Sequence, residues 1–448
     1  MKGKSPDQNQ QSFLYQGLKE LLNPQEPLYQ LAEKIDWETI EKEFAKYYIN
    51  FGRPSKPVRL MVSLMLLKQM YNLGDETVVA QWIQNPYWQY FSGEKIFQWR
   101  FPVEPSDLVH FRKRIGEEGI KKILEISIRL HGKSAMEKEV VIDTTVQEKN
   151  ITYPTDVKLY RKIIEQSRKI AEEENIKQRQ SYKRTVKKLL LLQRFRNHPK
   201  NKKKALQAER KLKTIAGRVL RELERELTAE KKKQHESKLK IFTRILGQKK
   251  NDKEKIYSIH EPEVYCISKG KEDKKYEFGS KASIVLTKKS GIIVGAYSLE
   301  KNEYDGHTLE RAIKQCEQLR GLRPSVAIAD RGYKGKKKIG DTEIVVPNSP
   351  KKTISQYEKK KVRERFRRRA SIEPVIGHLK TDNRLSRNFL RGIVGDQINV
   401  MLAAAAFNFR KWMRKAETFF VSFYRTLERL ILGAFKPVIL SLSLKITF

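Results

Sequence analysis

The sequence predicts a mixed α/β core that is interrupted by a long basic helical insertion and preceded by an all-α domain. Three observations support this: apolar strands separated by helical segments after residue 133, helical periodicity before residue 132, and a stretch of strong helix formers with almost no Gly or Pro. A chain of 448 residues that is 39% hydrophobic can form two or three domains. We expect domains at 1–132 and 133–415, an insertion at 155–255 and a C-terminal tail at 416–448.

The charge of the chain indicates a polyanionic partner. Lys and Arg total 93 against 53 Asp and Glu, so the formal net charge is +40. Such a field attracts nucleic acid or, as the alternative, an anionic membrane surface. Against the membrane, the N-terminus lacks the apolar segment of a signal peptide, and charged residues interrupt the apolar C-terminus before it could span a bilayer. We therefore expect nucleic acid as the partner and no membrane association.

The two cysteines, Cys266 and Cys316, lie far apart in the sequence, without a CxxC motif or a paired histidine. This spacing supports neither a disulfide framework nor a zinc site. We interpret both as ordinary core thiols of a protein in a reducing compartment.

The N-terminal region reads as short helices joined by tight turns. Residues 59–73 predict a buried helix, and 75–84 predict a second one with Asp75 as its cap. A third helix is predicted to begin at Ser106. It carries three consecutive basic residues, Arg112, Lys113 and Arg114. Arg112 and Lys113 are our candidate DNA contacts. The pattern resembles a helix-turn-helix DNA reader, but a helical bundle that only supports the next domain fits equally well.

The insertion is the most basic part of the chain. Residues 155–255 contain 33 Lys and Arg against 13 Asp and Glu, which is half of the net charge. We expect long helices, with a hairpin broken near Pro199. A solvated charged arm and an arm that follows the DNA backbone are both compatible with this composition.

Around the insertion, the sequence alternates between strand and helix patterns. Most predicted strands are apolar runs, and two of them are joined by a short turn as a hairpin. In order, we expect a strand at 139–145, hairpin strands at 276–288 and 291–300, a helix at 307–321, strands at 325–330 and 342–347, and a helix at 371–382.

Two aspartates end the apolar strands: Asp143 follows "VVI" and Asp330 follows "VAIA". A carboxylate in this position faces the crevice where α/β sheets bind ligands. With Glu373 on a following helix, a three-carboxylate cluster becomes possible, and divalent cations would relieve its repulsion. A pair of such ions clamps the attacking and leaving oxygens in phosphoryl transfer. Basic residues beside Glu373 could neutralise the phosphates: Arg368, Arg369 and Lys380.

The order of these acids resembles that of the DDE transposases of bacterial insertion sequences, which have an RNase H-like catalytic core. Their first Asp lies on the first strand, the second Asp on the fourth strand and the Glu on a later helix. The matching residues are Asp143 in "VVIDTT", Asp330 in "IADRGYKG" and Glu373 in "RRRASIEPVIGHLK".

The last motif looks closest to the fifth insertion-sequence family. That motif contains Tyr, Arg, Glu and Lys, and here Arg369, Glu373 and Lys380 match its spacing. Phe366 replaces the usual Tyr, which removes a hydroxyl but keeps the aromatic face. The segments "EFGSK" and "DGHTLE", the latter with His307, also look like the family.

The resemblance implies a bacterial transposase that binds the terminal inverted repeats of its own element, cleaves DNA with two Mg²⁺ or Mn²⁺ ions, and joins the freed 3′-hydroxyl to target DNA. It further implies action as a homo-oligomer on double-stranded DNA in the nucleoid of the cytoplasm. Two alternatives stay open: a nuclease of the same fold without strand transfer, and a non-catalytic DNA-binding protein derived from a transposase.

Two local questions concern the helix that carries Glu373. Pro374 disfavours helical geometry at the residue before it, so we expect a kink there rather than a helix that starts at Pro374. The simplest alternative for Glu373 is an intrahelical ion pair on a surface helix. His307 and His378 could assist the site, but structural roles are favoured for both.

Overall fold

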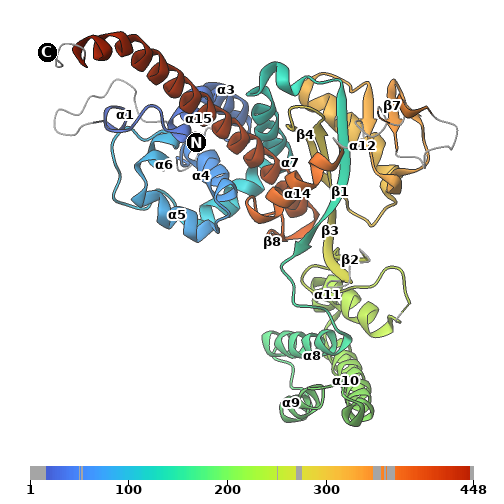
Figure 1. The fold of residues 1–448 in the computed structure, drawn as a ribbon. Coiled ribbons are helices and arrows are strands. Elements are labelled where there is room, and N and C mark those ends of the chain that lie inside the picture. Colours follow the sequence, from blue (N-terminus) through green and yellow to red (C-terminus); the bar gives the residue numbers. More distant parts are fainter. Residues whose placement is uncertain are drawn as a thin grey trace.

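The computed structural model shows a helical unit and a mixed sheet side by side, with a helical arm that projects away from both (Figure 1). The structure describes residues 17–49, 51, 54–249, 251–268, 275–346, 355–357, 360 and 369–443, with the side chains up to residue 417. Within this part of the chain, no helix is long and apolar enough to cross a membrane.

The core is an eight-stranded mixed sheet, as the sequence predicts. Strand β1 lies at its centre, antiparallel to β3 and parallel to β5, and β5 is parallel to β7. The predicted hairpin is confirmed, because β3 and β4 pair antiparallel. The strands are β1 (Glu139–Lys149), β2 (Tyr265–Ser268), β3 (Tyr276–Thr287), β4 (Ile293–Ser298), β5 (Val326–Ile328), β6 (Lys338–Ile339), β7 (Thr342–Val345) and β8 (Arg387–Asn388). The short strands β2, β6 and β8 were not predicted.

Strand β1 is longer than its apolar run predicts. It continues to Lys149 because β3 pairs with it from Val140 to Glu148. The two backbones approach closely at Gly279 of "EFGSK", where a Cβ atom would come within 2.0 Å of the carbonyl oxygen of Gln147. Only glycine allows this approach, so the motif keeps the strands paired beyond the apolar segment.

The outer edge of β4 is covered by side-chain amides. Asn408, Gln315 and Gln397 each bind both the N–H and the C=O of one β4 residue, at 2.8–3.0 Å. They come from helix α12 (Asp305–Arg320) and helix α15 (Gly392–Ser443). These contacts satisfy backbone groups that an exposed edge strand would offer to another chain.

The N-terminal helices share one hydrophobic core with the sheet. Helix α15 connects the two parts, since it packs against β4 and against α2, α4 and α7 (Figure 1). The boundary predicted near residue 132 is therefore not a break in the core, and the tail predicted from residue 416 begins inside α15. The N-terminal helices are α1 (Leu18–Leu21), α2 (Pro27–Lys34), α3 (Trp37–Phe44), α4 (Val58–Met70), α5 (Asp75–Gln84), α6 (Pro86–Phe91) and α7 (Pro105–Arg129).

The insertion folds as a helical arm with a core of its own. The predicted break is confirmed: helix α10 begins at Pro199, whose missing N–H is not needed in a first turn. The arm's core includes Ile256 and Ile259, so the arm extends slightly beyond the predicted end at residue 255. Its helices are α8 (Asp156–Glu173), α9 (Lys183–Leu191), α10 (Pro199–Glu226) and α11 (Ala229–Gly247).

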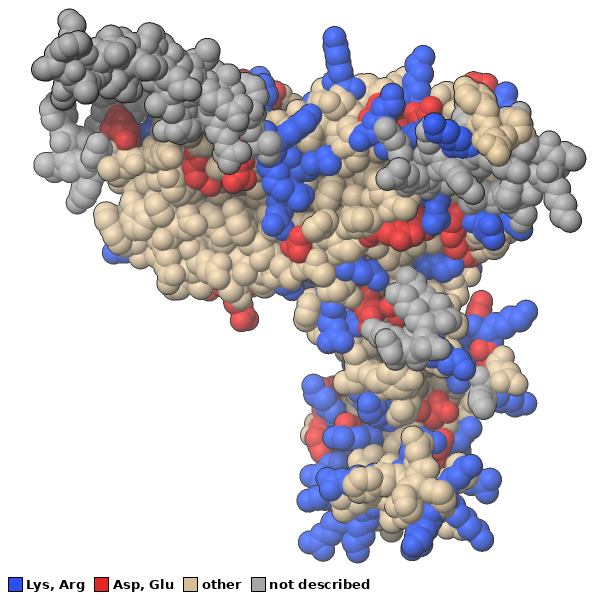
Figure 2. Space-filling view, viewed as in Figure 1, with Lys and Arg blue, Asp and Glu red and all other residues tan. Residues whose placement is uncertain are grey.

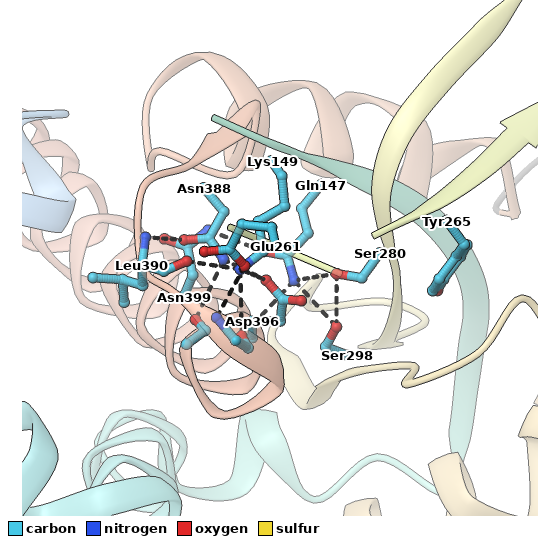
Figure 3. A network of polar contacts seen from close by, with 12 residues as sticks. Gln147, Lys149, Glu261, Tyr265, Ser280, Ser298, Asn388, Leu390, Asp396 and Asn399 are labelled. Carbon is cyan, nitrogen blue, oxygen red and sulfur yellow. Dashed lines mark hydrogen bonds and ion pairs between the residues drawn. The ribbon is translucent and has the colours of Figure 1, made fainter. Parts of the chain in front are cut away.

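A buried polar network joins the base of the arm to the core (Figure 3). The ammonium group of Lys149, at the end of β1, lies 2.7 Å from a carboxylate oxygen of Asp396 and 3.3 Å from one of Glu261. Lys149 also donates to the carbonyl oxygen of Leu390 at 2.7 Å. Glu261 lies on the segment returning from the arm and Asp396 on α15, so Lys149 ties three segments together.

The two thiols have different surroundings. Cys316 is buried in α12, and burial raises the pKa of its thiol to about 11. Cys266 on β2 is only half-buried, so the predicted core position holds for Cys316 and not fully for Cys266. Both thiols are free.

Candidate active site

The sheet places Asp143 and Asp330 next to each other. Strands β1 and β5 are parallel neighbours, with Val141 opposite Ile328, and each aspartate lies two residues beyond that pair. The turn after β5 fixes Asp330, whose carboxylate accepts a hydrogen bond from the N–H of Gly332 at 2.7 Å. The carboxyl ends of the two strands thus bring the first two predicted acids to one place.

A third aspartate, Asp305, lies at the same edge of the sheet. A Cβ atom on Gly332 would lie 2.9 Å from an oxygen of Asp330 and 3.8 Å from one of Asp305. Tyr333 is buried beside all three aspartates: burial and then the charges of Asp143, Asp305 and Asp330 hold the pKa of its hydroxyl well above the usual value. Asp305 is in turn paired with Lys281 of β3, 3.1 Å away.

Glu373 comes to this edge on helix α14 (Ile372–Thr381), which packs against β1. The helix begins at Ile372, so Pro374 lies in its first turn, where no N–H donor is required. The prediction of a kink at Pro374 was therefore wrong, and the helix does not start at the proline either. The Glu373 side chain is 64% exposed.

Arg369 connects the second and third acids. Its guanidinium lies 3.3 Å from a carboxylate oxygen of Glu373 and 4.0 Å from one of Asp330. The ion pair considered for Glu373 thus exists, but Arg369 lies in the 3-10 turn η4 (Arg369–Ser371) before α14, and its guanidinium also reaches Asp330. A guanidinium shared by two carboxylates marks a position that favours positive charge.

The site contains the carboxylate groups that a divalent metal ion requires, but they are not yet close enough together to bind one. Carboxylate oxygens are the ligands that Mg²⁺ and Mn²⁺ prefer. Across the described residues, however, no three His, Cys, Asp or Glu side chains are grouped closely enough to hold a metal ion. Arg369 now neutralises two of the acids, so binding of a cation between them requires the guanidinium to move.

The remaining predicted DNA contacts differ in their placement. Glu373 and Lys380 are seven residues apart within α14, which puts their side chains on one helix face. Lys113 is exposed on α7. Arg368, like Phe366, lies outside the described residues.

The prediction that Arg112 contacts DNA was wrong. Its side chain is buried and binds Asp75 with two hydrogen bonds of 2.6 and 2.8 Å, while Lys68 approaches the same carboxylate at 2.8 Å. Burial would raise the pKa of Asp75, but Arg112 and Lys68 outweigh it and lower this pKa to about 2. Asp75 thus links helices α4, α5 and α7 and is not a helix cap, a position that Gly74 occupies.

We expect substitutions of Arg112 and of the adjacent Lys113 to differ in their effect on folding stability. Arg112→Met removes two charge-assisted hydrogen bonds from the partly buried carboxylate of Asp75, which keeps only Lys68 as its charged partner, and should cost about 1.5–3 kcal/mol of folding free energy. Lys113→Met should change stability by less than about 0.5 kcal/mol. Urea unfolding of both variants beside the wild type measures this, and equal stabilities for the two variants would contradict the internal role of Arg112.

The two histidines lie outside the acid cluster. His378 contacts Asp382 at 2.9 Å, and the ring of His307 packs edge-on against Tyr304. Both side chains are exposed, so these contacts are local ones on the surface.

The sequence interpretation missed Asp305 and Lys281. Asp305 opens the segment "DGHTLE", where an aspartate in a first helical turn is ordinary helix chemistry. Lys281 belongs to "EFGSK", so both of the motifs that look like the family contribute a charge to this site. The presence of Asp305 and Lys281 in these two segments was the sequence signal that could have identified them.

Comparison with known proteins gives two family matches. Residues 16–114 match the family described as "Transposase domain (DUF772)", and residues 247–409 match the family described as "Transposase DDE domain". The second match contains Asp330 and Glu373, whereas Asp143 lies between the two matched regions. An "Uncharacterized protein ORF8 in nfe locus" of Rhizobium meliloti is 36% identical over 192 residues, which is 42% of this chain and 93% of that protein. No solved structure matches the chain significantly.

Proposed function

Because the chain belongs to the DDE transposases, a family that acts on DNA and generally uses divalent metal ions, we propose that Asp143, Asp330 and Glu373 are its catalytic, metal-binding acids. One observation carries this proposal: the register of β1 and β5 sets Asp143 beside Asp330, and Arg369 touches both Asp330 and Glu373. The strand order around β1 supports an RNase H-like core.

The carboxylates would hold two Mg²⁺ or Mn²⁺ ions, which stabilise the negative charge that develops on the phosphoryl oxygens and activate the attacking oxygen. Asp330 is pre-oriented by its hydrogen bond from Gly332, and the Asp305–Lys281 pair supports the same edge of the sheet. Arg369 would leave the acids for a DNA phosphate, which binds a guanidinium through two parallel hydrogen bonds.

The charge of the chain suits a DNA partner. On the face shown in Figure 2, Lys and Arg side chains dominate the arm, while basic and acidic side chains stand side by side over the sheet region. Lys380 lies on the same helix face as Glu373, about two turns further along α14, so a DNA strand that follows this face past the acids would also pass this cation. The spacing of Arg369, Glu373 and Lys380 further supports the fifth insertion-sequence family.

We propose that the reaction is hydrolysis at the ends of the protein's own element, followed by transfer of the freed 3′-hydroxyl to target DNA. Incubation of the protein and Mg²⁺ with a duplex that carries one end of the element, plus a circular target plasmid, tests this. The expected result is metal-dependent nicking and a covalent joint between duplex and plasmid. Nicking without joining would indicate a nuclease, and binding without nicking would indicate a non-catalytic DNA-binding protein.

A further inference from the structure

The far end of the arm has an unusual charge distribution. Residues 175–208 contain twelve Lys and Arg and no Asp or Glu. Eleven of the twelve are exposed, and Arg196, the exception, pairs with Glu209 at 3.2 Å. Figure 2 shows these basic side chains around the end of the arm that lies farthest from the sheet. We call residues 175–208 the arm tip. They comprise the segment before α9, α9 itself, the following turn and the first turns of α10.

The arm tip also exposes large apolar side chains. Phe195 is 79% exposed, and Leu191, Leu192 and Leu206 are 43–48% exposed. Phe195 lies in the turn between α9 and α10, flanked in the sequence by Arg194 and Arg196. Exposed apolar side chains inside so basic a surface are not explained by the arm's core, which uses other residues.

The backbone at Phe195 adds a second observation. Its φ of 56° lies in the left-handed region, which bulky residues rarely adopt and which Gly or Asn would occupy at lower cost. The turn is held on both sides: Gln193 donates to the carbonyl oxygen of Ala205 at 2.6 Å, and the carbonyl oxygen of Phe195 accepts from the N–H of His198 at 2.9 Å. The Phe195 ring is thus exposed to solvent by a strained backbone conformation, in a turn that hydrogen bonds hold in place.

We propose that the arm tip binds duplex DNA and inserts Phe195 between base pairs, so that the arm bends a DNA segment away from the catalytic acids. Basic side chains would neutralise the phosphates on either side, while the ring stacks on the bases that it separates. The surface favours DNA over a second copy of this chain, because two tips without acidic residues would repel each other. The choice of DNA as the polyanion rests on the proposed function.

The arm's attachment suits this role. Lys149 fixes the base of the arm to the same strand that carries Asp143, through buried contacts with Glu261 and Asp396. DNA bent at the arm tip would therefore be held in a defined relation to the acids. The tip would act on a DNA segment other than the one being cleaved.

The test uses the full chain in EDTA, so that no cleavage takes place, with a random 30-base-pair duplex. Dye-labelled ends report bending, and 2-aminopurine within the duplex reports unstacking. The wild type should shorten the end-to-end distance and raise 2-aminopurine fluorescence several-fold. Phe195→Asn, which suits the left-handed backbone, should lose at least about 80% of both signals while its Kd rises less than about tenfold.

Three further measurements separate the explanations. Tyr153→Ala removes another exposed aromatic residue, outside the arm tip, and should keep both signals. Replacing Lys202, Lys203 and Lys204 together by Gln should lower the slope of log K against log salt by about 2–3. Sedimentation of wild type and Phe195→Asn without DNA should give the same mass. Wild-type bending retained by Phe195→Asn, or a loss of oligomer in that variant, would overturn the proposal, whatever the outcome of the cleavage assay.

Discussion

Glu373→Gln should abolish metal-dependent nicking of end-containing DNA while leaving DNA binding intact. The substitution keeps the size of the side chain but removes a charge that a divalent ion needs. Loss of about 4 kcal/mol of transition-state stabilisation corresponds to about a thousandfold lower rate. DNA binding should stay equal or tighten, because one negative charge leaves a surface that faces phosphates. Single-turnover nicking beside a gel-shift titration measures both properties.

Asp143→Asn and Asp330→Asn should give the same result, and a double variant should lose little more than either single one, since groups that act as one unit are not additive. Asp341→Asn is the matched control, because this aspartate is exposed and precedes β7, at the opposite end of the parallel β5–β7 pair from Asp330. If Glu373 only formed an ion pair with Arg369, Glu373→Gln would cost at most about 1 kcal/mol of stability and leave nicking unchanged. Near-normal nicking by that variant would therefore refute its assignment.

Lys149→Met should be the most destabilising single change at the base of the arm. The ammonium group compensates Asp396 and Glu261, and all three side chains are at least 92% buried. Burial alone already raises the pKa of Asp396, which shows how costly its charge is in this environment. Without Lys149, two buried carboxylates remain, and we expect a loss of about 3–5 kcal/mol in the free energy of unfolding.

The control for this prediction is Lys158→Met, on the first turn of the arm, whose ammonium group donates to a carbonyl oxygen at an exposed position. It should change the unfolding free energy by less than about 0.5 kcal/mol. Denaturant unfolding followed by circular dichroism compares the two variants. A Lys149→Met protein as stable as the wild type would show that the network does not hold the arm to the core.

Much of the core could be predicted because its signals are local. The apolar run before Asp143 and the one before Asp330 each identify a strand and the acid that follows it. Composition alone revealed the arm, and Pro199 marked its break. Such features depend on a few neighbouring residues, so they can be predicted without knowledge of the fold.

The errors concern contacts between distant segments. Arg112 looked like part of a basic surface, yet it lies four residues after Leu108 and three before Ile115 on the buried stripe of α7, where Asp75 from another helix meets it. Asp305 joins Asp330 only because α12 begins beside the end of β5. The partners of Lys149 are likewise distant in the sequence: Glu261 lies 112 positions away and Asp396 lies 247 positions away. No local pattern specifies which partners the fold will supply.

The central claim, that acids from three separate segments form one site for divalent ions, can be tested by iron-directed cleavage of the protein itself. Fe²⁺ replaces Mg²⁺ at carboxylate sites, and with ascorbate and peroxide it cuts the polypeptide close to where it is bound. We expect fragments that end near Asp143, Asp330 and Glu373, suppressed by excess Mg²⁺ and lost together in Asp143→Asn. Cuts at other positions, or cuts near Asp330 and Glu373 that persist in Asp143→Asn, would contradict a shared metal site.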